Sequence, residues 1–371
     1  MDVKSGFCTP MKNFQSIHYL RGIAAFGVLL YHAVVYVSGY GSHQLPANLA
    51  AIGMAGVDIF FVISGFILVV TMNPTRSAGE FMAGRVARVG LPYWSVLLAL
   101  ACASLVIPSA FRNIDWNGLD LMASFLFLPT VMSHGGLFPI LEPGWTLCLE
   151  MLFYILLAAS LSLAPAFRSV AICAALGALV GAGLILDLPP GEGLGWFFTQ
   201  SVLLEFCFGI AIAQIYMRGI EIGRGAAMML LALSCIGFAI AAFHPPEAFA
   251  PIRVLTFGIP ATLLVAGAVF LERAGGWFGS RTLMFLGTVS YSLYLTHALV
   301  LGVTVRLMAG RLPGLGGDIV MLTVAIAVSL VGAFVFYRIV EQPSLWFSAR
   351  VKKLRPASPQ TPLSAPSNLA T

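Results

Sequence analysis

Long apolar runs recur along this chain from end to end, and they constrain its fold more than any other feature. A hydrocarbon core of about 30 Å is crossed by about 20 residues of helix. Hydrophobic residues make up 59% of the chain and charged residues only 9%, whereas a soluble domain has about a quarter charged residues. The pattern predicts an all-α, polytopic bundle of about ten membrane helices, over residues 16–38, 50–72, 90–108, 145–164, 168–187, 196–217, 225–243, 252–271, 283–309 and 316–340.

A shorter apolar piece, Leu119–Met132, is interrupted by Pro129, and we expect it to be interfacial or re-entrant. The predicted organisation is a cytoplasmic segment over 1–13, a membrane domain over 14–343, and a tail over 344–371 that is basic and then disordered. The last part of this tail is rich in Pro, Ser and Ala, a composition that cannot bury enough apolar surface to fold.

The distribution of Lys and Arg predicts the orientation. Cytoplasmic loops carry an excess of these residues. With the N-terminus in the cytoplasm, 16 of the 20 Lys and Arg residues lie on or near that side. An even number of spans then places both termini in the cytoplasm.

Several function classes lack support in the sequence. No basic stripe interleaved with aromatics suggests a nucleic-acid partner. The six cysteines form no CxxC pair, so neither a metal site nor a disulfide framework is expected. There is no GxSxG, HExxH, Walker A or HxxxxD motif.

Charged groups at bilayer depth cost about 2.5–3.5 kcal/mol or more, so they tend to face a bundle interior or a water-filled cavity. Arg21 and His32 are eleven residues apart, which places them on one helix face and ~16 Å apart along the axis. We interpret them as two ends of one functional face. A snorkelling arginine and a packing histidine remain the alternative.

Two carboxylates are expected at nearly the same depth in the membrane as His32. Straight helices place His32 ~9 Å, Asp58 ~12 Å and Glu150 ~8 Å below the outer edge. Three ionisable groups from three helices would then share one level. Imidazole and carboxylate are the pair used in acid–base catalysis near neutral pH. A structural hydrogen bond is the alternative for Asp58.

Other polar residues are open to two interpretations. Glu205 is expected to be structural. His297 shares a helix face with Tyr294, and these two could line a cavity or simply pack. Arg85 and Arg88 are spaced i, i+3 and could recognise phosphate, or could be the ordinary positive-inside signal.

Six stretches, in order along the chain, resemble the motifs of acyltransferase family 3. They are IHYLRGIAAFGVLLYHA with Arg21 and His32, GVDIFFVISGFIL with Asp58, RVARVGLPYW with Arg85 and Arg88, PGWTLCLEMLFYIL with Trp145 and Glu150, LGTVSYSLYLTHALV with Tyr294 and His297, and VEQPS. The resemblance runs from about Phe14 to Pro343 and is strongest to the exopolysaccharide and O-antigen O-acetyltransferase branch.

This resemblance implies an enzyme of the bacterial inner membrane that moves an acyl group, acetyl in the simplest case, from cytoplasmic acyl-CoA to a glycan hydroxyl. It implies no permanently bound cofactor and no metal. The expected catalytic residues are His32, as base or transient acyl carrier, with Glu150 or Asp58 orienting it. The expected substrate-binding residues are Arg21, Arg85, Arg88, Trp145, Tyr294 and His297. A glycan or lipid transporter or flippase using the same polar residues is the alternative, and the lack of inverted repeats counts against it.

Overall fold

The structure is a computed structural model that describes residues 14–41, 45, 50–73, 76–106, 116–131 and 136–353. The predicted N-terminal segment 1–13 and the end of the predicted tail, 354–371, lie outside this range. Within it, nine helices are long and apolar enough to cross a membrane, and a tenth and shorter apolar helix covers Ser201–Met217. The all-α, polytopic membrane fold predicted from the apolar runs is confirmed.

The main helices are α1 (Gln15–Tyr40), α3 (Gly56–Val70), α4 (Ala78–Arg85), α5 (Leu91–Val106), α7 (Trp145–Ser160), α8 (Pro165–Leu186), α10 (Leu204–Met217), α11 (Arg224–Phe243), α12 (Ile259–Arg273), α13 (Arg281–Met308), α14 (Gly314–Phe336) and α15 (Gln342–Lys353). Short helices join them: η1 (Ile52–Ala55), η2 (Val86–Gly90), η4 (Glu142–Gly144), α9 (Gly193–Phe197), η5 (Ser201–Leu203), η6 (Val254–Gly258) and η7 (Tyr337–Glu341).

Glycines let α1 approach two neighbours closely at the centre of the bundle. A Cβ at Gly22 would lie 2.6 Å from the backbone nitrogen of Gly287 in α13, and one at Gly53 would collide with the backbone of Gly27. Small residues at such crossings are how membrane helices bring their backbones together. The helix pair α1 and α13 therefore runs side by side, and η1 enters the bundle halfway along α1.

The short apolar segment after α5 does not span. It forms α6 (Gly118–Phe125) and a hairpin of β1 (Thr130–Val131) with β2 (Leu137–Phe138). The indole Nε1 of Trp94 in α5 donates a 2.9 Å hydrogen bond to the carbonyl of Phe125. An eight-residue helix is ~12 Å long, so the prediction of a non-spanning segment agrees with the structure.

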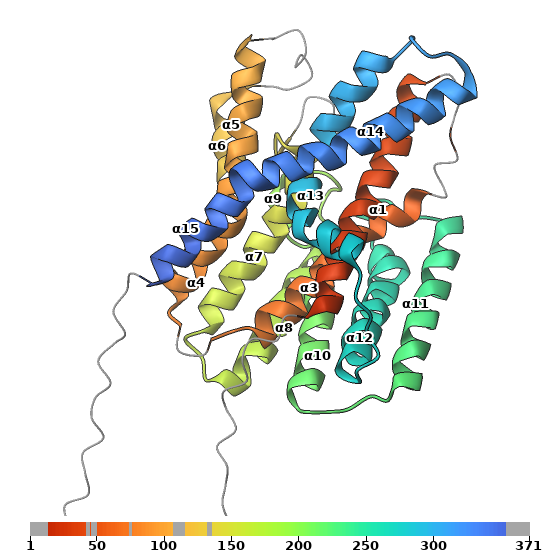
Figure 1. The fold of residues 1–371 in the computed structure, drawn as a ribbon. Helices are drawn as coiled ribbons and strands as arrows, with labels where there is room; N and C mark the ends of the chain where they lie inside the picture. Colours follow the sequence, from red (N-terminus) through yellow and green to blue (C-terminus); the bar gives the residue numbers. More distant parts are fainter. Residues whose placement is uncertain are drawn as a thin grey trace, which may run out of the picture.

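The C-terminal helices form one long rod. Figure 1 shows α14 passing through η7 into α15 and crossing the bundle obliquely. The basic first part of the predicted tail is helical as far as Lys353. The π-helix η7 carries the chain from α14 into this helix through Tyr337–Glu341.

Candidate active site

A cavity of about 510 Å³ lies between α1, α3, α7, α13 and the segment joining α3 to η2. Four guanidinium groups and one carboxylate line it: Arg21, Arg76, Arg85, Arg88 and Glu150. Its other polar side chains, among the described residues, are His18, Ser64, Thr71, Thr146, Tyr154, Tyr291 and Tyr294. We call it the arginine cavity. Its charge balance suits an anion.

The arginine pair reaches the cavity from a helix whose geometry changes between the two residues. Ser77 and Glu80 form a capping box that starts α4, Arg85 ends it, and Arg88 lies in the π-helix η2. Single π turns are common at functional sites. The Arg85 guanidinium lies over two aromatic rings, 5.7 Å from the centroid of Phe81 and 6.0 Å from that of Tyr154. These contacts fix its direction while leaving its donors available.

Arg21 faces the same cavity from α1. It lies close enough to Arg88, Glu341 and Glu150 to interact with them electrostatically. Within the part of the chain that the structure describes, the Nε atoms of both Arg21 and Arg85 are buried without a hydrogen-bond partner. Buried guanidinium donors without partners are costly, so they favour an anionic ligand at this place.

Glu150 belongs to the arginine cavity and not to His32. One of its carboxylate oxygens accepts hydrogen bonds from the Ser64 hydroxyl at 2.9 Å and from the Tyr154 hydroxyl at 2.5 Å. Glu150 lies one helical turn beyond Thr146, whose hydroxyl is 2.8 Å from that of Tyr294. Since Tyr294 is itself nearly one turn before His297, Glu150 lies roughly 10 Å nearer to the Arg21 end than the level of His297.

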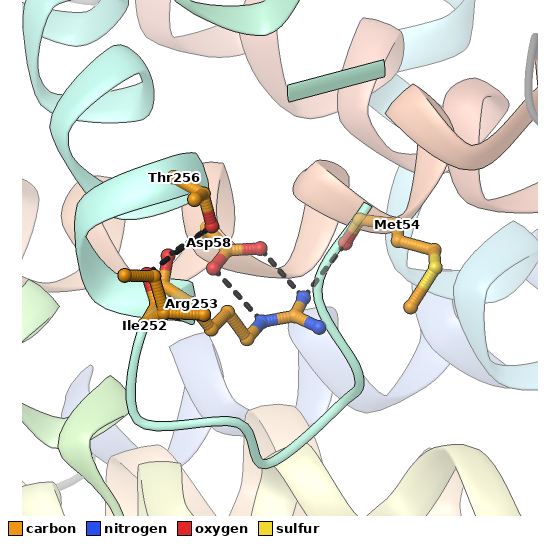
Figure 2. Close-up of polar contacts among 5 residues, drawn as sticks. All are labelled: Met54, Asp58, Ile252, Arg253 and Thr256. Carbon is orange, nitrogen blue, oxygen red and sulfur yellow. Dashed lines mark hydrogen bonds and ion pairs between the residues drawn. The ribbon is translucent and has the colours of Figure 1, made fainter. Parts of the chain in front are cut away.

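Asp58 is also bound elsewhere. Its two oxygens accept hydrogen bonds from Nε and Nη2 of Arg253, at 3.0 and 2.6 Å, and the same Nη2 donates to the Met54 carbonyl (Figure 2). Asp58 is fully buried and Arg253 is 2% exposed. Glu205 lies near both and is fully buried, and neither of its oxygens has a hydrogen-bond partner among the described residues.

The expectation that His32, Asp58 and Glu150 share one level is therefore not met. The error comes from treating the second span as a straight helix that starts at the outer edge. In the structure η1 packs at the level of Gly27, and a Cβ at Gly56 would collide with the carbonyl of Ala24. Because Asp58 follows Gly56 in α3, it lies roughly 12 Å or more from the level of His32. A catalytic role for either carboxylate stays a prediction.

His32 instead meets His297. Their ring centroids are 4.9 Å apart, with an interplanar angle of 59°. Nδ1 of His32 lies 2.9 Å from the Val28 carbonyl. A carbonyl oxygen only accepts, so this nitrogen carries the proton in the neutral ring, and Nε2 keeps its lone pair. The geometry thus leaves Nε2 as the nitrogen of the neutral His32 ring that has a free lone pair.

Tyr294 connects the arginine cavity to the histidine pair. It lines the cavity, its hydroxyl donates to the Pro143 carbonyl at 3.1 Å, and its ring centroid is 5.8 Å from that of His297. Neither histidine is part of the cavity lining. Trp145 lies outside the lining as well, with its ring packed against Phe61 and Phe249 at centroid distances of 6.4 and 5.0 Å.

Comparison with known proteins decides the family. The family model described as an acyltransferase domain matches residues 14–338. The chain belongs to acyltransferase family 3. This membership confirms the resemblance found in the motifs, and it shows that the protein is a multi-pass membrane O-acyltransferase.

The chain is also similar to three known proteins. It is 34% identical to the exopolysaccharide production protein ExoZ of Rhizobium meliloti, over 79% of this chain and 90% of that protein. It is 26% identical to the acyltransferase MdmB of Streptomyces mycarofaciens, over 80% and 81% of the two chains. It is 25% identical to a membrane-bound transacylase, BcsY, of Komagataeibacter xylinus, over 78% and 73%. No solved structure matches the chain.

Sequence reasoning missed several residues of this family member. Arg76, Tyr154 and Tyr291 are not among the predicted site residues, yet all three line the cavity. Arg253 is also not among the predicted site residues, and it is buried against Asp58. An arginine at the start of an apolar span is the signal for this ion pair, because a charge there needs a partner.

Proposed function

We propose that this acyltransferase takes an acyl group, acetyl in the simplest case, from acyl-CoA and transfers it to a hydroxyl of a glycan such as an exopolysaccharide. The observation that carries the proposal is the arginine cavity, which presents four guanidinium groups at one end and touches the histidine pair through Tyr294 at the other. The ExoZ relative, which is named for exopolysaccharide production, supports the choice of acceptor.

The donor end is argued from charge. Guanidinium groups form short, charge-assisted hydrogen bonds to phosphate, often two at a time. Coenzyme A carries phosphates at one end and the thioester at the far end of a long arm. Phosphates held by Arg85 and Arg88, with Arg21 and Arg76 beside them, direct the arm along α1 toward Tyr294. Arg21 and His32 then mark the two ends of the donor, ~16 Å apart along the helix.

The reacting end is argued from the tautomer of His32. Its Nε2 lone pair can take the proton of the acceptor hydroxyl as a general base, or it can attack the thioester carbonyl and carry the acyl group. In both cases the thioester C–S bond breaks and an ester C–O bond forms.

The orientation follows from the same charges. We propose that the protein lies in the cytoplasmic membrane with the arginine cavity open to the cytoplasm, where acyl-CoA is found. The glycan then approaches His32 from the opposite side. Both termini lie on the cytoplasmic side in this arrangement.

The test uses purified protein in proteoliposomes with radiolabelled acetyl-CoA and deacetylated exopolysaccharide. We expect label in the polysaccharide as an ester that mild base releases. Acetyl-dephospho-CoA, which lacks the 3′-phosphate, serves as the matched donor, and we expect a higher KM for it with little change in kcat. Transport of glycan across the membrane without acyl transfer would contradict the proposal and favour a flippase.

A further inference from the structure

His297 is the second imidazole of the site, and the proposed binding of the donor gives it no role. It lies on α13, is 1% exposed, and touches His32 on α1. Its Nδ1 is 2.6 Å from the carbonyl of Tyr294. Its Nε2 is buried and has no hydrogen-bond partner within the described residues.

His32 and His297 are held in the same tautomer. A carbonyl oxygen is the partner of Nδ1 in His32 and in His297. Both Nδ1 atoms therefore carry a proton, and both Nε2 atoms carry a lone pair in the neutral state. The rings of His32 and His297 are in contact, and in each ring Nδ1 is bonded to a backbone carbonyl, so Nε2 is the basic nitrogen. A buried Nε2 without a donor is unfavourable for a purely structural histidine.

This arrangement limits what His32 can do alone. Once an acyl group is on Nε2 of His32, no free lone pair is left on that ring to take a proton. Among the described residues, Glu142 is the carboxylate that interacts electrostatically with His32, but its side chain is exposed to solvent. His297 is the base in ring contact with His32 that still has a free lone pair.

We propose that the two histidines divide the reaction, with His32 receiving the acyl group and His297 deprotonating the acceptor hydroxyl. This inference rests on the proposed function. In the first step Nε2 of His32 attacks the thioester carbonyl, a C–N bond forms, the C–S bond breaks, and the CoA thiolate leaves and takes a proton from water. In the second step the acceptor oxygen attacks the same carbon and the C–N bond breaks. The hydroxyl proton passes to Nε2 of His297 and then to water.

The experiment separates the two steps in the purified full-length protein. Without acceptor, the wild type is mixed with acetyl-CoA and released CoA is quantified by chromatography. We expect about one CoA per protein, matched by acyl label on the protein. Addition of the glycan should then clear this label.

The informative variant is His297→Gln, because an amide can hydrogen-bond but cannot take a proton at neutral pH. We expect it to release its one CoA at the wild-type rate and to keep the label, while transfer to the glycan falls by roughly 10²–10⁴-fold. His32→Gln should release no CoA. Glu142→Gln is the matched control and should behave as wild type in both steps.

Three outcomes would overturn the inference. Wild-type transfer by His297→Gln would remove its role as a base. Loss of CoA release in that variant, with the protein still folded by thermal melting, would place His297 in the first step. A wild type that transfers to glycan but releases no CoA without it would exclude the acyl-His32 step and leave the proposed function standing. Absence of any acyl transfer by the wild type would instead contradict the proposed function itself.

Discussion

The arginine cavity and the Asp58–Arg253 pair are both charged regions inside an apolar bundle, and they are built in opposite ways. The pair is closed: both carboxylate oxygens are bonded to one guanidinium, and both side chains are almost fully buried. The cavity is open and unbalanced, with four guanidinium groups, one carboxylate, and buried Nε atoms on Arg21 and Arg85 that lack partners among the described residues.

This contrast offers a criterion for separating structural from functional charges in a membrane bundle. A group whose hydrogen-bonding capacity is used inside the protein holds helices together, as Asp58 holds α3 to the start of η6. A buried charged group whose hydrogen-bond donors or acceptors stay unpaired at a cavity is unfavourable until a ligand binds to it. The first kind should control stability and the second kind should control kinetics.

The largest expected effect concerns the reacting nitrogen of His32. Replacement by alanine should lower kcat by roughly 10²–10⁴-fold, the usual contribution of a positioned acid–base or nucleophilic group. Folding should be nearly unchanged, because the imidazole is only partly buried and its Nδ1 bond is local to α1. Acetyl transfer in membranes, normalised to the amount of protein by immunoblot, measures this. Transfer at the wild-type rate would sink the assignment of His32 as the reacting residue.

The next effect is on stability. Asp58→Asn leaves the Arg253 guanidinium buried without its counter-charge, and breaking a buried pair on one side costs about 3–5 kcal/mol. We expect less folded protein and a much lower Tm in detergent. The control replaces both partners, Asp58→Leu with Arg253→Met, and should recover much of the Tm because neither member of the ion pair is left buried without the other. A single variant as stable as wild type would contradict the structural role.

A smaller effect is expected in the cavity. Arg85→Ala removes a phosphate contact worth about 1.5–3 kcal/mol, so the KM for acyl-CoA should rise by roughly 10–150-fold with little change in kcat. The Tm of this variant should stay the same or rise, because one of the like-charged guanidinium groups in the cavity is removed. If Arg85 binds the diphosphate of CoA, the ratio of the KM values for acetyl-dephospho-CoA and acetyl-CoA should be the same in this variant as in the wild type. An unchanged KM would make the arginine pair a positive-inside signal and nothing more.

The smallest expected effect distinguishes two places for Glu150: in the arginine cavity, or beside His32 as the residue that orients it. Glu150→Gln keeps an oxygen that accepts from Ser64 and Tyr154, but it removes the one carboxylate among the described residues that line the cavity. We expect the KM for acyl-CoA to fall a few-fold, because the cavity becomes more positive. Steady-state kinetics over donor concentration measure this. A 10²-fold loss of kcat with unchanged KM would instead support the sequence-based hypothesis that Glu150 orients His32.

The motifs predicted some contacts of the site and not others. Arg85 and Arg88 do line one cavity with Arg21, because a pair at the start of a span needs only local helix geometry to face the same way. His32 and Asp58 were expected together and are apart. Their relation depends on how deep η1 enters the bundle, which no local pattern in residues 50–58 reports.

The membrane fold, the order of the apolar helices and the inventory of polar groups that lipid cannot accommodate could all be predicted from sequence alone. These are properties of single segments, set by helix length and by the cost of burying charge. Which of those groups meet depends on how the helices pack against one another. Asp58 meets Arg253 across 195 residues and His32 meets His297 across two helices, because the depth and rotation of each helix are fixed by close packing at positions such as Gly22 and Gly53.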